Sequence, residues 1–112
     1  MITRQDLAKG YQAVQSIHAA IQFGMEHPDV HRFWFDKSNY LGLLSVANEY
    51  ELGRLIEKAI EYGIKFSIFR EPDIDNQITA IALSPGPKSK KLCSNLKLAL
   101  SEEKDINMTL VK

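Results

Sequence analysis

The residues best suited to chemistry fall into two groups, one near the start of the chain and one in a polar segment of its second half. Gln15 and His18 are three positions apart, so in a helix both side chains point to the same region. The segment from Asp73 to Thr79 overlaps residues 71–77, the densest acidic cluster beside an apolar run. A carboxylate there, such as Asp75, can orient a water or the hydroxyl of Thr79 for attack on an ester. We therefore predict one site that joins the first helix to this segment.

Each of these residues also has a purely structural interpretation. His18 falls on the apolar stripe of its helix, where a buried histidine with a hydrogen-bond partner is the ordinary outcome. Asp75 sits in a proline-bearing polar loop, where a carboxylate often caps backbone amides. The residues alone leave both interpretations open.

Common catalytic and metal-binding motifs are missing from the sequence. It contains no glycine-rich phosphate loop, no Gly-x-Ser-x-Gly and no His-Glu-x-x-His. His18 and His27 are nine positions apart, and Pro28 separates His27 from His31, so no single element presents a good ligand pair. Cys93 is the one cysteine, which excludes an intrachain disulfide and a paired-cysteine zinc site. We expect no metal.

Composition predicts one globular domain. The chain has 112 residues, of which 45% are hydrophobic and 25% charged, enough to bury a single core. Fourteen basic residues balance fourteen acidic ones, so any nucleic-acid footprint must be local. The basic residues concentrate in one stretch, where a hydrophilic surface is the simpler interpretation: Lys88, Lys90, Lys91 and Lys97. We expect no membrane span and no signal peptide, and the single cysteine favours a cytoplasmic location.

The first helix must carry Gln15 and His18. Apolar residues recur there in steps of three and four, which predicts a helix with one buried stripe ending before Pro28. The members of that stripe are Tyr11, Val14, His18, Ile21 and Met25. Residues 28–35 predict a short second helix with three aromatic packing groups, Phe33, Trp34 and Phe35.

Strands and helices alternate through the rest of the chain. Residues 1–4 and 40–46 read as strands, and Asn48 with Glu51 forms a capping box for a helix that ends at Gly63. The apolar face of that helix is predicted to contain Leu52, Leu55, Ile56, Ala59 and Ile60. Residues 65–70 alternate as a half-buried strand and 78–83 form an apolar, central one. Strand 40–46, its helix and strand 65–70 predict a right-handed βαβ unit with parallel strands.

The sequence also resembles a known family. Residues 9–19, KGYQAVQSIHA, resemble the first-helix motif of the type II peptidyl-tRNA hydrolases, Gly-Lys-x-x-Ala-Gln-x-x-His-Ala. Residues 75–79 are similar to the Asp-x-x-x-Thr segment of that family, and residues 96–98 to its Leu-Lys-Leu ending. The resemblance implies an α/β fold, a three-layer α/β/α sandwich around a four-stranded mixed sheet. We expect one domain over residues 1–100 and a charged tail over 101–112, with residues 108–111 as a candidate extra strand.

The activity implied by the resemblance is hydrolysis of the ester between a peptide, or N-blocked amino acid, and tRNA, with no metal or organic cofactor. Peptidyl-tRNA is the expected partner, and a homodimer is one expected assembly. The residues expected to be catalytic are Gln15, His18, Asp75, Thr79 and Tyr11. Those expected to contact RNA phosphates are Lys9, Lys88, Lys90 and Lys91.

Two cations of the family motifs are replaced in this chain. Tyr11 stands where the resemblance places a lysine, and a phenol with a pKa near ~10 donates a hydrogen bond but carries no charge at neutral pH. Ile78 stands where the family has an arginine before the threonine. Two alternatives therefore stay open, a non-catalytic RNA- or protein-binding module that keeps the fold, and a hydrolase of a different ester or amide.

Overall fold

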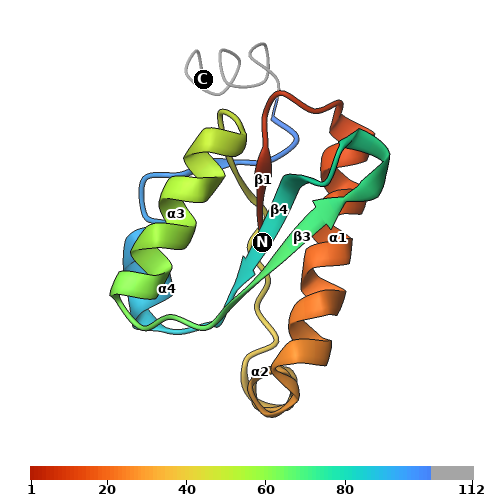
Figure 1. Ribbon diagram of the computed structural model, residues 1–112. Helices are drawn as coiled ribbons and strands as arrows, with labels where there is room; N and C mark the ends of the chain where they lie inside the picture. The colour runs from red at the N-terminus through yellow and green to blue at the C-terminus, as the bar shows by residue number, and fades with distance from the viewer. Residues whose placement is uncertain (102–112) are drawn as a thin grey trace, which may run out of the picture.

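A five-stranded mixed sheet organises the computed structural model, which describes residues 1–101 (Figure 1). The strand order across the sheet is β3-β4-β1-β2-β5. The bounds are Ile2–Arg4 for β1, Leu44–Val46 for β2, Phe66–Glu71 for β3, Gln77–Leu83 for β4 and Lys97–Leu98 for β5. β1 pairs with β2 in parallel, while the other neighbouring strands pair antiparallel.

Helices cover both faces of this sheet, and Figure 1 shows α1 on one side and α3 on the other. The helix bounds are Lys9–Glu26 for α1, Pro28–Lys37 for α2, Glu49–Glu61 for α3 and Pro87–Leu92 for α4, with a 3₁₀ turn η1 at Pro72–Ile74. The predicted α/β sandwich with a mixed sheet is therefore confirmed. The strand count is five rather than four because the two-residue β5 adds to the free edge of β2. The strand considered for residues 108–111 lies outside the described residues.

The predicted βαβ unit is confirmed in the direction of its strands, but these strands are not neighbours in the sheet. β2 and β3 run in the same direction, but β1 and β4 lie between them. The parallel neighbours are instead β1 and β2, which α1 and α2 connect. The order depends on contacts between the first strand and β4, which are distant in sequence and leave no local pattern.

The core beneath α3 follows the predicted pattern. The side chain of Asn48 accepts a hydrogen bond from the Glu51 amide, at 3.1 Å, and so caps the helix. Four of the five predicted core positions are buried, Leu52, Leu55, Ile56 and Ala59. Ile60 is 64% exposed, because the apolar stripe of α3 is narrower than predicted.

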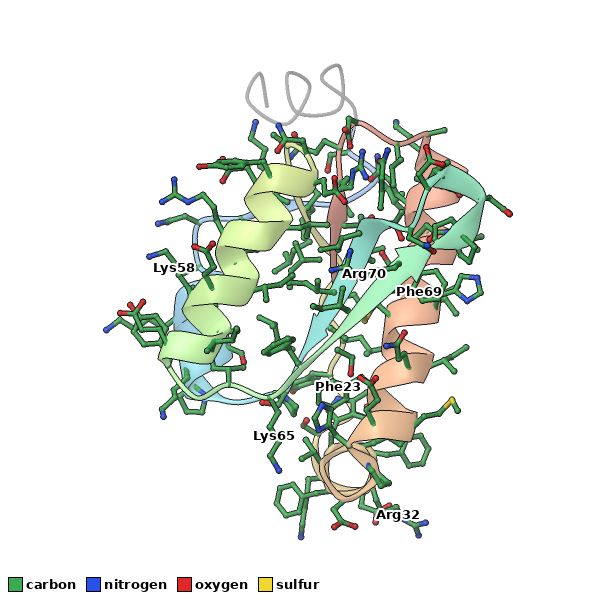
Figure 2. The ribbon with its side chains drawn as sticks, viewed as in Figure 1. Phe23, Arg32, Lys58, Lys65, Phe69 and Arg70 are labelled. Atoms are coloured by element: carbon green, nitrogen blue, oxygen red, sulfur yellow. The ribbon has the colours of Figure 1, made fainter. Side chains whose placement is uncertain are left out.

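The buried face of α1 is not the predicted one. The predicted stripe is exposed, with Val14 at 50%, Ile21 at 57% and Met25 at 78%. The buried positions are Gln12, Gln15, Ser16, Ala19 and Phe23. The sheet opposes α1 with small residues, Ala80 and Ala82, and the buried Gln15 amide has hydrogen-bond partners on β3 and β4. The buried Gln12 amide donates instead to the Leu7 carbonyl, just before α1. Figure 2 shows Phe23 and Phe69 on the side of the sheet that α1 covers.

No described helix is long and apolar enough to cross a membrane.

Candidate functional site

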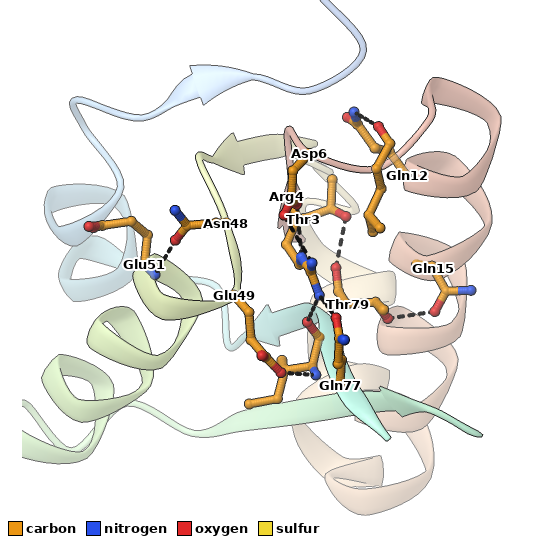
Figure 3. A network of polar contacts seen from close by, with 12 residues as sticks. Thr3, Arg4, Asp6, Gln12, Gln15, Asn48, Glu49, Glu51, Gln77 and Thr79 are labelled. Atoms are coloured by element: carbon orange, nitrogen blue, oxygen red, sulfur yellow. Dashed lines mark hydrogen bonds and ion pairs between the residues drawn. The ribbon is translucent and has the colours of Figure 1, made fainter. Parts of the chain in front are cut away.

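Gln15 ties α1 to both strands of the β3–β4 hairpin. The Thr79 hydroxyl donates a hydrogen bond to Gln15 Oε1 at 2.5 Å (Figure 3). Gln15 Nε2 in turn donates to the Glu71 carboxylate at 3.0 Å. Gln15 is 1% exposed and Thr79 is fully buried, so the hydrogen bond between them is shielded from water, while the one to Glu71 is partly buried. The structure thus joins the first helix to the second predicted segment through these two residues.

A β-bulge aims Thr79 at α1. Phe69 pairs with Ala80 and Arg70 pairs with Ile78, which leaves Thr79 as the extra residue on β4. Regular alternation would send Thr79 and Ala80 to opposite faces. Here Thr79 bonds to Gln15, while Ala80 packs with residues of the same helix. The Thr79 carbonyl accepts a hydrogen bond from the Thr3 hydroxyl at 2.9 Å, which further fixes the bulge (Figure 3).

His18 lies on Phe69 of β3 rather than in the core. The two rings stack with centroids 4.5 Å apart and planes within 10°. The side chain is exposed, and its ring nitrogens bond to no other group within residues 1–101. The stack therefore fixes the plane of the imidazole and leaves its nitrogens available to solvent or a ligand.

Tyr11 faces the acidic end of β3. Partial desolvation of the phenol, the charges of Glu71 and Asp73 and a hydrogen bond to Glu71 all raise the pKa of Tyr11 above its ordinary value. The phenol therefore stays protonated at neutral pH and acts as a hydrogen-bond donor. It lies at the same carboxylate that Gln15 reaches.

Glu71 is the residue that sequence reasoning missed. It accepts hydrogen bonds from Gln15 Nε2 and, at 3.4 Å, from the Asp73 amide, and Tyr11 contacts it as well. The signal in the sequence was the acidic stretch itself, of which Glu71 is the first member. The contact with α1 depends on the hairpin register, which no local pattern encodes.

Asp75 lies at the turn of the hairpin and is exposed. Its backbone is left-handed, with φ of 59°, and Asn76 follows at 58°. Its carboxylate makes no hydrogen bond or ion pair with residues 1–101. The backbone cap of the turn comes from Glu71, which accepts from the Asp73 amide.

A second polar network supports the start of β4 (Figure 3). Arg4 is 7% exposed, and two of its nitrogens each lie 2.9 Å from an oxygen of Asp6. Its third nitrogen donates to Gln77 Oε1 at 2.9 Å and to the Ile78 carbonyl at 3.1 Å. The hydrogen bond from Arg4 lowers the pKa of Asp6, and the same contact raises the pKa of Arg4. Glu49 accepts from the Ile78 amide at 2.7 Å, so β4 is fixed one residue before Thr79.

The lysines considered for RNA phosphates do not form one cluster. Lys9 is the first residue of α1, two positions before Tyr11. Lys88, Lys90 and Lys91 lie on α4, beyond the far end of β4. A strand of seven residues spans about 20 Å, so the two groups lie at opposite ends of the sheet. Arg70 is a further exposed cation near the hairpin turn, and it donates to the Asn76 carbonyl at 3.4 Å.

Residues 1–101 contain no group of three or more His, Cys, Asp or Glu side chains that could hold a metal ion. The groups gathered between α1 and the hairpin are an amide, a threonine, an imidazole, a phenol and carboxylates. In a comparison with protein families, the model of the family described as peptidyl-tRNA hydrolase PTH2 matches residues 1–99. The match covers nearly all of the described residues, and the chain therefore belongs to the peptidyl-tRNA hydrolase PTH2 family.

Proposed function

We propose that the chain hydrolyses the ester that joins a peptide, or an N-blocked amino acid, to tRNA. Membership of the family supports this activity at the level of the family. The observation that carries it to this chain is the Gln15–Thr79 hydrogen bond, since the bulge on β4 serves to turn Thr79 toward α1. This arrangement joins both halves of the family motif in one buried contact.

We assign different roles to the buried and the exposed residues of the site. Thr79 has no exposed surface and its hydroxyl donates to Gln15, so we assign both residues to positioning. The groups that can reach a substrate are Asp75, His18 and Tyr11. Asp75 is the proposed general base that takes a proton from water as its oxygen attacks the ester carbon. The bond to the tRNA oxygen then breaks, and that oxygen takes the proton from Asp75 and leaves as a hydroxyl, which restores the carboxylate. His18 and Tyr11 donate hydrogen bonds to the reacting group.

The partner that fits this reaction is tRNA. We propose that Lys9 contacts phosphates beside the site and that Lys88, Lys90 and Lys91 contact them further along, since an RNA helix easily exceeds their separation. No cofactor enters the proposed reaction. A cytoplasmic location and a homodimer complete the proposal. The homodimer is supported by the large aliphatic side chains that α1 leaves exposed.

A second candidate function is hydrolysis of an ester or amide with no phosphate-rich leaving group. It is favoured by the carboxylates that surround Tyr11, namely Glu71 and Asp73, with Asp75 at the turn. Negative charge there repels phosphates. This chain also lacks the cation that the family motif carries at the position of Tyr11. A binding module without catalysis would keep the fold and lose only the reaction.

The deciding experiment follows release of N-acetyl-amino acid from N-acetyl-aminoacyl-tRNA. We expect turnover by the wild-type chain and a loss of about 100-fold or more in Asp75→Ala. Asp29→Ala is the matched control, because Asp29 is an exposed acid in the first turn of α2. No turnover by folded protein would contradict the proposal. Salt-sensitive tRNA binding without release would instead identify a binding module.

A further inference from the structure

A large open cavity lies away from the Gln15–Thr79 site. Its volume is ≈ 910 Å³, within the range of small-molecule sites. It is lined by the second half of α1, by α2, by the segment that leads to β2 and by the region from the end of β4 through α4. Figure 2 shows Phe23, one of its lining residues, near α2 and far along α1 from the hairpin. Tyr11, Gln15, His18, Asp75 and Thr79 do not line it.

The walls of the cavity are mostly aromatic and aliphatic. Phe23, Trp34 and Tyr40 supply rings, and Leu41 and Leu83 supply aliphatic surface. The Trp34 indole is fixed by a hydrogen bond of 2.7 Å to the Tyr40 carbonyl. Such walls favour an apolar ligand, because binding removes its apolar surface from water.

Among the lining side chains of the described residues, one is a lysine, Lys90, and none is acidic. Lys90 is exposed, and its ammonium makes no hydrogen bond or ion pair within residues 1–101. Its neighbour Lys88 does not line the cavity and donates instead to the Tyr62 carbonyl at 3.2 Å. The α-amino group of Met1, also in the lining, donates to the Gly42 carbonyl at 2.7 Å. Lys90 is thus the side-chain cation that an incoming anion would meet.

We propose that this cavity is a second ligand site, which binds a small amphipathic anion with an apolar body and a carboxylate-like head. The body lies against the aromatic walls, and the head pairs with the Lys90 ammonium. The site shares none of the residues assigned to the chemical step, Asp75, His18, Tyr11, Gln15 and Thr79. It does share Lys90 with the residues that we propose to contact tRNA phosphates.

The chain carries its own reporter of occupancy, because Trp34 is its single tryptophan and lines the cavity. The probes are decanoate and 1-decanol, which share an apolar chain and differ in the charge of the head. Each is titrated below its aggregation concentration while Trp34 fluorescence is recorded. We expect a saturable change with decanoate.

Two lysine variants separate the head-group contact from general surface charge. Lys90→Met keeps an apolar stem and should weaken decanoate binding roughly two- to fivefold, as expected for an exposed ion pair, with no change for decanol. Lys88→Met, on the same short helix, should leave both probes unchanged. Equal weakening of decanoate by both variants would contradict the proposal, because it would report only the net charge of α4.

Two further variants test the cavity itself. Ala20→Phe fills it from α1 and should weaken both probes about tenfold, whereas Val14→Phe, on the outer face of the same helix, should not. If Ala20→Phe fails to fold, Tyr40→Asp serves instead, because Tyr40 is 85% exposed and the new carboxylate repels decanoate more than decanol. The proposal is overturned if Trp34 does not respond, or if sedimentation shows that the probes bind only after a dimer dissociates, since a second copy would then be the occupant.

Discussion

Gln15 is almost fully buried, and both ends of its side-chain amide form hydrogen bonds. Its oxygen accepts from Thr79 and its nitrogen donates to Glu71, so a side chain of the same shape but different charge disturbs only one contact. This makes the residue a sensitive test of the site's electrostatics. A carboxylate at position 15 would still accept from Thr79 but would face the Glu71 carboxylate.

We expect Gln15→Glu to lower the free energy of unfolding by about 2 kcal/mol at pH 7, because it buries a charge against a like charge. Both effects raise the pKa of the new carboxyl in the folded state. The destabilisation should therefore shrink as pH falls toward 5 and the group takes up its proton. Urea unfolding at the two pH values measures this.

Gln22→Glu is the control for this change. Gln22 also donates to a glutamate, Glu26, at 3.0 Å, but on the exposed surface of the same helix. Like charges four residues apart on a helix cost only about 0.5 kcal/mol in water. Equal destabilisation by the two variants would mean that Gln15 is not in a shielded environment.

Tyr11 tests the chemistry of the same site. Tyr11→Lys restores a cation beside Glu71 and Asp73, and we expect it to raise kcat/KM for N-acetyl-aminoacyl-tRNA about tenfold through binding or oxyanion stabilisation. Tyr11→Phe removes the hydrogen bond to Glu71 and should lower the rate. Release assays on both variants, at equal folded fraction, make the comparison. A lower rate for the lysine variant would favour a substrate other than tRNA.

At the scale of elements, the sequence pattern predicts the buried face of α3 largely correctly and that of α1 incorrectly. Asn48 and Glu51 mark the start of α3, and its apolar positions are buried because β1, β2 and β4 offer it large aliphatic side chains. On the opposite face, β4 offers alanines, so α1 approaches with small and hydrogen-bonded residues. Hydropathy alone cannot distinguish a buried glutamine with partners from an exposed one.

The same reasoning explains which parts of the site were predictable. Gln15 and Thr79 were identified from their motifs, and they meet in the structure. The role of Glu71 and the bulge at Thr79 depend on how β3 pairs with β4, one residue out of regular register. The neighbours of β1 likewise follow from long-range pairing, which local periodicity does not contain.

The two faces of α3 give a direct test of its packing. Leu52 is fully buried, and we expect Leu52→Ala to cost about 3 kcal/mol of unfolding free energy through the cavity it leaves. Ile60 is 64% exposed, so Ile60→Ala should change stability by less than about 0.5 kcal/mol. Chemical denaturation of both variants compares them. A large loss from Ile60→Ala would show that this face is covered in solution.

The connection from β1 to α1 is held by the Arg4–Asp6 pair, which predicts a pH dependence. The pKa of Asp6 is lowered in the folded state, so its contribution to stability is complete above the unfolded value near ~3.9 and is lost as pH falls through the folded value. Because Asp6 is 42% exposed, we expect Asp6→Asn to cost only about 1 kcal/mol at pH 7. The cost should shrink progressively as pH falls below the unfolded value. Chemical unfolding of both proteins across this pH range measures the difference. A difference in unfolding free energy between wild type and Asp6→Asn that stays constant down to pH 2 would contradict the prediction.

At the scale of the whole molecule, a net charge of zero conceals two separated groups. Glu71, Asp73 and Asp75 gather at the hairpin, whereas the lysines of α4 lie beyond the opposite end of β4. An RNA that binds through both Lys9 and α4 must therefore extend along the sheet for about 20 Å. A small ester needs only the hairpin end, so the reach of the substrate distinguishes the candidate functions.

The salt dependence of tRNA binding measures that reach. Each phosphate contact contributes about 0.7–0.9 to the slope of log K against log salt concentration. We expect Lys9→Ala and Lys91→Ala each to lower the slope by that amount if tRNA spans both ends of the sheet. Lys58→Ala is the control, because Lys58 is an exposed residue of α3 (Figure 2). An effect of Lys9 alone would confine the RNA to the hairpin end and leave α4 as a hydrophilic surface. Equal effects of all three variants would contradict a localised footprint, because they would report only the total charge of the chain.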